Sequence, residues 1–124
     1  MVFYGESVLL VRPSYSHQKF SLPGGGVKRG ESWADAATRE LLEETGIQVE
    51  LRYFGTYQQE IEYKHDTVQC FYAAVDDPTF RVDDNEIVEG GWFAVADLPD
   101  ERTASVDRII TLYQEYSRAH EEVT

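Results

Sequence analysis

The stretch from Gly24 to Ile47, GGGVKRGESWADAATRELLEETGI, constrains this chain more than any other part of its sequence. Its run of glycines interrupts regular structure and lets the backbone come close to a ligand. Ser32 is a favoured helix N-cap and Gly46 a favoured C-terminal stop, so the pattern predicts a helix that ends near Thr45. A glycine loop therefore leads directly into a helix.

Three glutamates of this helix share one face. Glu40, Glu43 and Glu44 stand at positions i, i+3 and i+4. Like charges at this spacing weaken a helix by about 0.2–0.5 kcal/mol per pair. Mg²⁺ or Mn²⁺ would offset the repulsion, because these hard cations prefer oxygen ligands. The alternative is an ordinary solvated helix face on which Arg39 pairs with Glu43.

The rest of the chain favours an α+β domain with a mixed β-sheet and helices packed on its faces. We expect residues 1–124 to form a single domain. Val2–Tyr4 is interpreted as the tail of a longer strand. A second helix is expected over Ala104–His120, with an apolar stripe that contacts the core. The expected strands are Val8–Arg12, a short one at Phe20–Leu22, Val49–Tyr57, Glu60–Tyr63, Thr67–Val75 and Gly91–Val95.

Charge and cysteine content narrow the function classes. The net charge is −12, from 11 basic and 23 acidic residues, which disfavours nucleic-acid polymers and anionic membranes as partners. The single cysteine, Cys70, is expected to be a buried apolar residue. No apolar stretch is long enough for a membrane span, and no export signal opens the sequence, so we expect a cytoplasmic protein.

The order of residues in the glycine–helix segment resembles the Nudix box, Gly-x5-Glu-x7-Arg-Glu-U-x-Glu-Glu-x-Gly-U, where U is a bulky aliphatic residue. All specified positions match, which is far more specific than a lone glycine motif. The flanking Leu22-Pro23 and the later Trp92-Phe93 and Leu98-Pro99 agree with the family as well. The matching residues are Gly25, Glu31, Arg39, Glu40, Leu41, Glu43, Glu44, Gly46 and Ile47.

The resemblance implies an α/β/α sandwich in which the box forms a loop–helix–loop and a C-terminal helix closes the chain. It implies Mg²⁺ as cofactor, with Mn²⁺ able to substitute. The expected metal ligands are Glu40, Glu43, Glu44 and the Gly25 carbonyl. Glu43, Glu44 and Arg39 are expected to serve catalysis, while Glu31 and Gly46 hold the box in shape.

The function implied by the resemblance is magnesium-dependent hydrolysis of a phosphoanhydride bond. The substrate would be a nucleoside diphosphate linked to another group, such as a nucleotide sugar, a dinucleoside polyphosphate or a nucleoside triphosphate. The partner is thus a small nucleotide. A nucleotide-binding sensor of the same fold that does not cleave its ligand is the alternative.

In this family the general base is often a glutamate in a late loop outside the box. The stretch from Val82 to Glu89 is the corresponding region here. We favour Glu86 as the base, with Glu89 as the second candidate, although a box glutamate can also serve. Asp83 and Asp84 are interpreted as a solvated turn.

Residues for substrate binding are less constrained. Arg12 is a candidate for a phosphate contact or an ordinary surface residue. Phe20 is a candidate for a base pocket or for core packing. Tyr63 lies where dinucleoside polyphosphate hydrolases carry a tyrosine, but it also fits strand packing. A homodimer is an open alternative to a monomer, because a short first strand leaves an edge that a second copy could cover.

Overall fold

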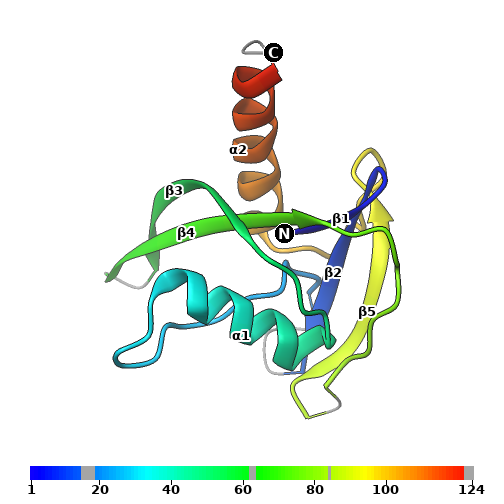
Figure 1. The fold of residues 1–124 in the computed structure, drawn as a ribbon, viewed down its shortest axis with the longest axis horizontal. Helices are drawn as coiled ribbons and strands as arrows, with labels where there is room; N and C mark the ends of the chain where they lie inside the picture. Colours follow the sequence, from blue (N-terminus) through cyan, green and yellow to red (C-terminus); the bar gives the residue numbers. More distant parts are fainter. Residues whose placement is uncertain (15–18, 62–63, 84, 122–124) are drawn as a thin grey trace.

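The computed structural model describes residues 1–14, 19–61, 64–83 and 85–121, with the backbone alone for residues 61, 64, 65 and 121. The strands form one mixed sheet in the order β3-β4-β1-β2-β5 (Figure 1). β1 pairs parallel with β4, and the other neighbouring strands pair antiparallel. The elements are β1 (Val2–Tyr4), β2 (Ser7–Pro13), α1 (Trp33–Thr45), β3 (Arg52–Ile61), β4 (Lys64–Ala74), β5 (Ile87–Ala94) and α2 (Ala104–Glu121).

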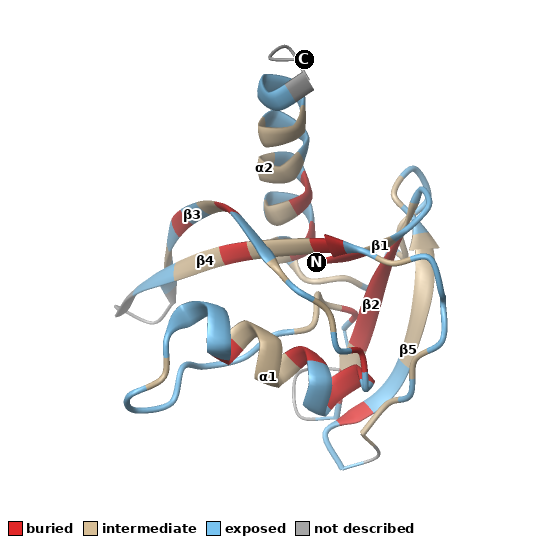
Figure 2. Ribbon diagram, viewed as in Figure 1, coloured by how far each residue is buried: buried red, intermediate tan, exposed pale blue. Residues whose placement is uncertain are grey.

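The interior strand β2 has a core on each of its faces. Val8 and Leu10 belong to a buried cluster that includes residues of α2, such as Val106. Leu9, between them, belongs to a second cluster with Leu41 of α1. Successive side chains of a strand point to opposite faces, so one helix covers each face of the sheet. This confirms the expected α+β sandwich, and Figure 2 shows β2 as a buried element.

Helix α1 has the expected limits, and its caps explain them. The Ser32 side chain accepts a hydrogen bond from the Asp35 backbone amide at 3.1 Å. Gly46 adopts a left-handed conformation with φ of 72°, and its amide donates to the Leu42 carbonyl at 2.9 Å. The helix turns Glu44 towards the protein interior together with Leu41. One carboxylate of the box is thus placed on the buried face.

Strand β3 (Arg52–Ile61) runs without interruption through the break predicted between Val49–Tyr57 and Glu60–Tyr63, so the prediction of that break was wrong. The polar residues Gln58 and Gln59 lie between the two predicted strands. In the structure they continue the ladder of the β3–β4 hairpin, opposite Thr67 and Asp66. Gln58 is exposed on one face of the strand, and Gln59, on the opposite face, lines a cavity.

The first strands lie inside the sheet rather than at its edge. β1 is hydrogen-bonded to both β4 and β2, and β2 is also paired with β5. The edge strands are β3 and β5. The short first strand therefore offers no edge to a second copy, contrary to the expectation from the sequence. The segment expected as a strand at Phe20–Leu22 forms isolated bridges, Val11 with Ser21 and Phe20 with Arg102.

Helix α2 packs by the stripe that its sequence predicts. Val106 and Ile110 are buried in the core, and Ile109, Tyr113 and Tyr116 pack against it. Cys70 lies in the same cluster with 4% of its surface exposed, as expected for a small apolar residue. None of the helices in the described ranges is long and apolar enough to cross a membrane.

Candidate functional site

The Arg39 guanidinium connects the box loop to the glutamates of α1. Its Nε and Nη2 atoms donate to Glu31 at 2.8 and 3.0 Å. Nη1 donates to Glu40 at 2.8 Å and to Glu43 at 3.3 Å, and Nη2 also donates to the Gly26 carbonyl at 3.0 Å. One cation thus orients several carboxylates and one turn of the loop.

Glu31 secures the other side of this connection. Its carboxylate accepts the two Arg39 bonds and a further bond from the Lys28 backbone amide at 2.9 Å. These bonds lower the pKa of Glu31 to about 2, with the Arg39 hydrogen bonds as the largest cause. Glu31 is therefore charged at neutral pH and holds the loop against the helix.

Glu44 is in a different electrostatic position. Its side chain is buried, and one oxygen accepts a hydrogen bond from the Gly24 amide at 2.8 Å. Burial is the main reason that the pKa of Glu44 rises to about 8, and the negative charges of Glu40, Glu86 and Glu43 add to the rise. The Gly24 bond opposes this shift only in part. A cation at this point would relieve the electrostatic cost of ionising Glu44.

Gly25 lies directly against the Glu40 carboxylate. A Cβ atom added at Gly25 would be 2.5 Å from Cδ of Glu40, whereas one added at Gly24 or Gly26 would meet no atom within 4 Å. A side chain at Gly25 would therefore displace the carboxylate. The absence of a side chain lets the Gly25 backbone lie against the Glu40 carboxylate, and a hard cation is bound by oxygen ligands of these two kinds.

The loop that carries Glu86 is anchored beside the end of α1. The Asp83 amide donates to the Glu44 carbonyl at 3.3 Å, and the Glu86 amide donates to the Asp83 carbonyl at 3.1 Å. The Glu86 carbonyl accepts from the Ser14 amide at 2.9 Å. The Glu86 side chain is exposed, and its charge raises the pKa of Glu44. Glu89 instead forms an ion pair with Arg12 at 3.4 Å.

The remaining predicted residues are placed differently. Phe20 is 8% exposed and meets the Phe93 ring edge-on, with 5.0 Å between ring centroids, so it fills the core. Arg12 lies over the Phe20 ring at 5.7 Å, and its buried Nε has no hydrogen-bond partner among the described residues. Tyr63 lies outside the described residues.

The side chains of Glu40, Glu43 and Glu44 are not arranged as a set of metal ligands. In the described ranges, no group of three or more His, Cys, Asp or Glu side chains is placed to hold a metal ion. Instead, the Arg39 guanidinium forms ion pairs with Glu40 and Glu43. The chemistry of the site nevertheless suits a hard divalent cation. It combines carboxylate oxygens, a glycine backbone in contact with one carboxylate, and a buried Glu44 of raised pKa.

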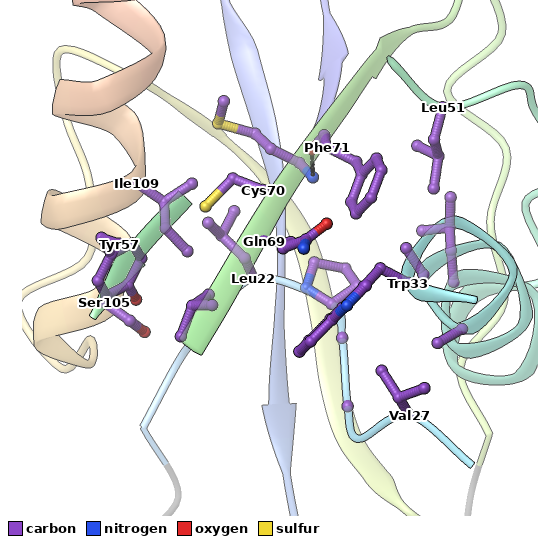
Figure 3. A pocket seen from close by; sticks show the side chains of 18 of the residues that line it. Leu22, Val27, Trp33, Leu51, Tyr57, Gln69, Cys70, Phe71, Ser105 and Ile109 are labelled. Carbon is purple, nitrogen blue, oxygen red and sulfur yellow. Dashed lines mark hydrogen bonds between the residues drawn. The ribbon is translucent and has the colours of Figure 1, made fainter. Parts of the chain in front are cut away.

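A cavity of about 500 Å³ opens beside these carboxylates. It extends from the backbone of Gly24 and Gly25 to the first turn of α2 at Ser105, between α1 and the β3–β4 hairpin. Figure 3 shows Trp33 of α1 and Gln69 of β4 among the side chains that line it. Neither residue was predicted from the sequence, because the two are distant in the chain. An aromatic residue at the solvent-exposed start of a helix was the available signal.

The comparisons with known proteins agree with this geometry. The family model for the NUDIX domain matches residues 1–113. The chain belongs to the Nudix hydrolase family. The NAD-capped RNA hydrolase NudC of Chromobacterium violaceum is 33% identical over 101 residues, which cover 80% of this chain and 37% of that protein. This Nudix chain thus spans little more than a third of the length of that relative.

Solved structures of other family members have the same fold. The MutT NUDIX hydrolase from Burkholderia pseudomallei has a TM-score of 0.79 and 26% identity, with 91% of each chain covered. An Ap4A hydrolase from C. elegans has a TM-score of 0.78 and 22% identity, covering 95% of this Nudix chain and 93% of its own. The second likeness is one of fold alone.

The raised pKa of Glu44 predicts a specific pH dependence of stability in the metal-free protein. Because the folded-state pKa is raised, the stability that Glu44 contributes is complete below its ordinary pKa of 4.5 and is lost as the pH rises to about 8. Thermal unfolding in a chelating buffer between these values should show this loss. Glu44→Gln should remove it, and Glu50→Gln, at an exposed position that does not contribute to the Glu44 shift, should keep the wild-type profile. Parallel profiles for wild type and Glu44→Gln would contradict the prediction.

Proposed function

We propose that this chain hydrolyses a phosphoanhydride bond in a nucleoside diphosphate linked to another group, with Mg²⁺ as the cofactor and Mn²⁺ able to replace it. The observation that carries the proposal is the buried Glu44, whose pKa is raised by burial and by three acidic neighbours beside the glycine loop. Nudix hydrolases generally use divalent metal ions. Glu40, Glu43, Glu44 and the Gly25 carbonyl would hold the ion here.

The ion's chemistry, when bound, is to screen the diphosphate charge and lower the pKa of a coordinated water. The chain's own residues prepare for this role. Arg39 holds Glu40 and Glu43 close together, and Glu31 keeps Arg39 in position from the other side. If Glu40 and Glu43 turned towards a metal ion, Arg39 could keep its bonds to Glu31 and to the Gly26 carbonyl. Without Arg39, the Glu40 and Glu43 carboxylates would lose their orientation, whether or not a metal ion is bound.

Glu86 is our candidate for the general base. Its side chain is exposed, it is near enough to Glu44 to raise the pKa of that group, and the backbone around it is hydrogen-bonded to Ser14 and Asp83. Glu89 is less suited, because its carboxylate is paired with Arg12. A base must accept a proton from water, and a carboxylate that faces solvent beside the site can do so.

The proposed substrate is a small nucleotide rather than a polymer. The net charge of −12 opposes binding to a polyanion. The similarity to a protein named NAD-capped RNA hydrolase makes a capped RNA end the competing substrate. That protein is much longer than the region matched here, so its activity as a whole is not transferred to this chain.

The direct test is turnover. Purified protein with Mg²⁺ should be incubated with NAD, ADP-ribose, UDP-glucose, diadenosine tetraphosphate, 8-oxo-dGTP and a short NAD-capped RNA. We expect hydrolysis of small nucleotides, lost on chelation and in Glu44→Gln. Faster turnover of the capped RNA would overturn the preference for small substrates. Nucleotide binding without turnover of any substrate would favour a sensor over an enzyme.

The glycine loop gives a sharper test of the metal site. Gly25→Ala should move the Glu40 carboxylate and weaken Mg²⁺ binding by about 10- to 100-fold, the range for residues that orient metal ligands. Gly26→Ala is the matched control, because its added Cβ meets nothing within 4 Å. Calorimetric metal titrations of both variants, with melting temperatures as a check of folding, make the comparison. Equal metal affinity in both variants would argue against a site at Gly25 and Glu40.

The candidate base can be tested against its neighbour. Glu86→Gln should lower kcat by about 10²- to 10⁴-fold with little change in KM, because a general base acts on the transition state. Glu89→Gln should retain most activity, since Glu89 pairs with Arg12. If the two variants are equally active, or Glu89→Gln is the poorer enzyme, the assignment to Glu86 fails.

A further inference from the structure

We propose that Trp33 and Gln69 form the base-recognition site of this enzyme, with the Trp33 indole stacking on an adenine ring and the Gln69 amide reading its edge. The inference rests on the proposed function for the position of the phosphates. It goes further by naming the group attached to them and the side chains that select it.

Trp33 makes no ring contact with another aromatic residue in the described part of the chain, and its side chain is open to solvent. It is the first residue of α1, lines the cavity and is 44% exposed. Its indole N–H makes no hydrogen bond within the described part of the chain. Trp92, by contrast, donates its indole N–H to the Pro78 carbonyl at 2.9 Å and packs beside Phe80. Trp92 supports the fold, and Trp33 leaves an aromatic face open to a ligand.

Gln69 supplies hydrogen-bonding groups at the same cavity. Its backbone belongs to the β3–β4 ladder opposite Thr56, which places the side chain on a rigid strand. No side-chain hydrogen bond joins its amide to another described residue. Both side chains line the same cavity, and Figure 3 shows the Trp33 indole extending from α1 towards β4. A glutamine amide both donates and accepts, and it matches the N6 and N7 edge of adenine in a bidentate manner.

The remaining walls of the cavity suit an uncharged planar group. Its volume of about 500 Å³ falls within the range of small-molecule sites, about 300–1,000 Å³. Among the described residues that line it, none has an Asp, Glu, Lys, Arg or His side chain. Aliphatic and aromatic residues such as Leu22, Leu51 and Phe71 form most of its surface. A neutral base is therefore favoured over a charged group.

The cavity also reaches the phosphate end of the proposed site. Gly24 and Gly25 line it, and the same residues contact the carboxylates of Glu44 and Glu40. A nucleotide with its base beside Trp33 would therefore extend its phosphates towards these carboxylates. The base pocket and the proposed metal site are two ends of one cleft.

Binding of monophosphates tests this inference separately from hydrolysis, because these ligands contain no anhydride bond. The probes are AMP, IMP (which replaces the adenine amino group by a carbonyl) and ribose 5-phosphate, which lacks a base. Calorimetric titrations in the presence of Mg²⁺ would compare wild type, Trp33→Leu and Gln69→Leu. Leu42→Ala is the matched control: Leu42 is on the same helix with 43% exposure but does not line the cavity.

We expect wild type to bind AMP more tightly than IMP, and IMP more tightly than ribose 5-phosphate. Trp33→Leu should weaken AMP and IMP about tenfold or more, as for loss of a stacking platform. Gln69→Leu should abolish the difference between AMP and IMP, and Leu42→Ala should change nothing. AMP should also quench the tryptophan fluorescence of wild type but not of Trp33→Leu.

Unchanged AMP binding by Trp33→Leu, or AMP binding no tighter than that of ribose 5-phosphate, would overturn the inference. If the enzyme hydrolyses small nucleotides while Trp33→Leu leaves KM unchanged, the proposed function stands and the base site fails. If AMP binds as expected but no substrate is cleaved, the base site stands and the hydrolase proposal fails. Melting temperatures of all variants would verify that each one is folded.

Discussion

The contact between Arg39 and Glu31 supports the arrangement of the whole site. The guanidinium holds Glu31 through two bonds and reaches Glu40, Glu43 and the Gly26 carbonyl with its remaining donors. A planar guanidinium suits this task, because its donors have a fixed geometry that a lysine cannot reproduce. These bonds join the box loop to α1. They also hold glutamates that repel one another around the Arg39 guanidinium.

Two carboxylates of the same motif are held in opposite electrostatic states. Glu31, bonded to Arg39, has its pKa lowered to about 2. Glu44, buried and surrounded by negative charge, has its pKa raised to about 8. Glu31 is suited to a permanent structural bond. Glu44 is suited to exchange a proton for a cation, because a cation offsets both its burial and its acidic neighbours.

The sandwich fold explains why the Nudix box lies beside the cavity. α1 covers one face of the sheet and buries Glu44 on its inner side, while its first turn presents Trp33 to the cavity beside β4. The box loop passes between these two ends, with Gly24 bonded to Glu44. One helix therefore carries both the acidic site and, as we infer, the aromatic wall that selects the ligand.

The sequence by itself determined the helix from Trp33 to Thr45, the shared face of its glutamates and the family, because caps, helical spacing and a motif of fixed order are local properties. It also indicated the buried strands, but polar residues at Gln58 and Gln59 concealed the length of β3, whose ladder depends on pairing with β4. Tertiary structure alone decided that Glu86 lies near Glu44, that Phe20 fills the core and that Trp33 and Gln69 line one cavity. These outcomes depend on contacts between distant segments, and no local pattern records which segments the folded sheet brings together.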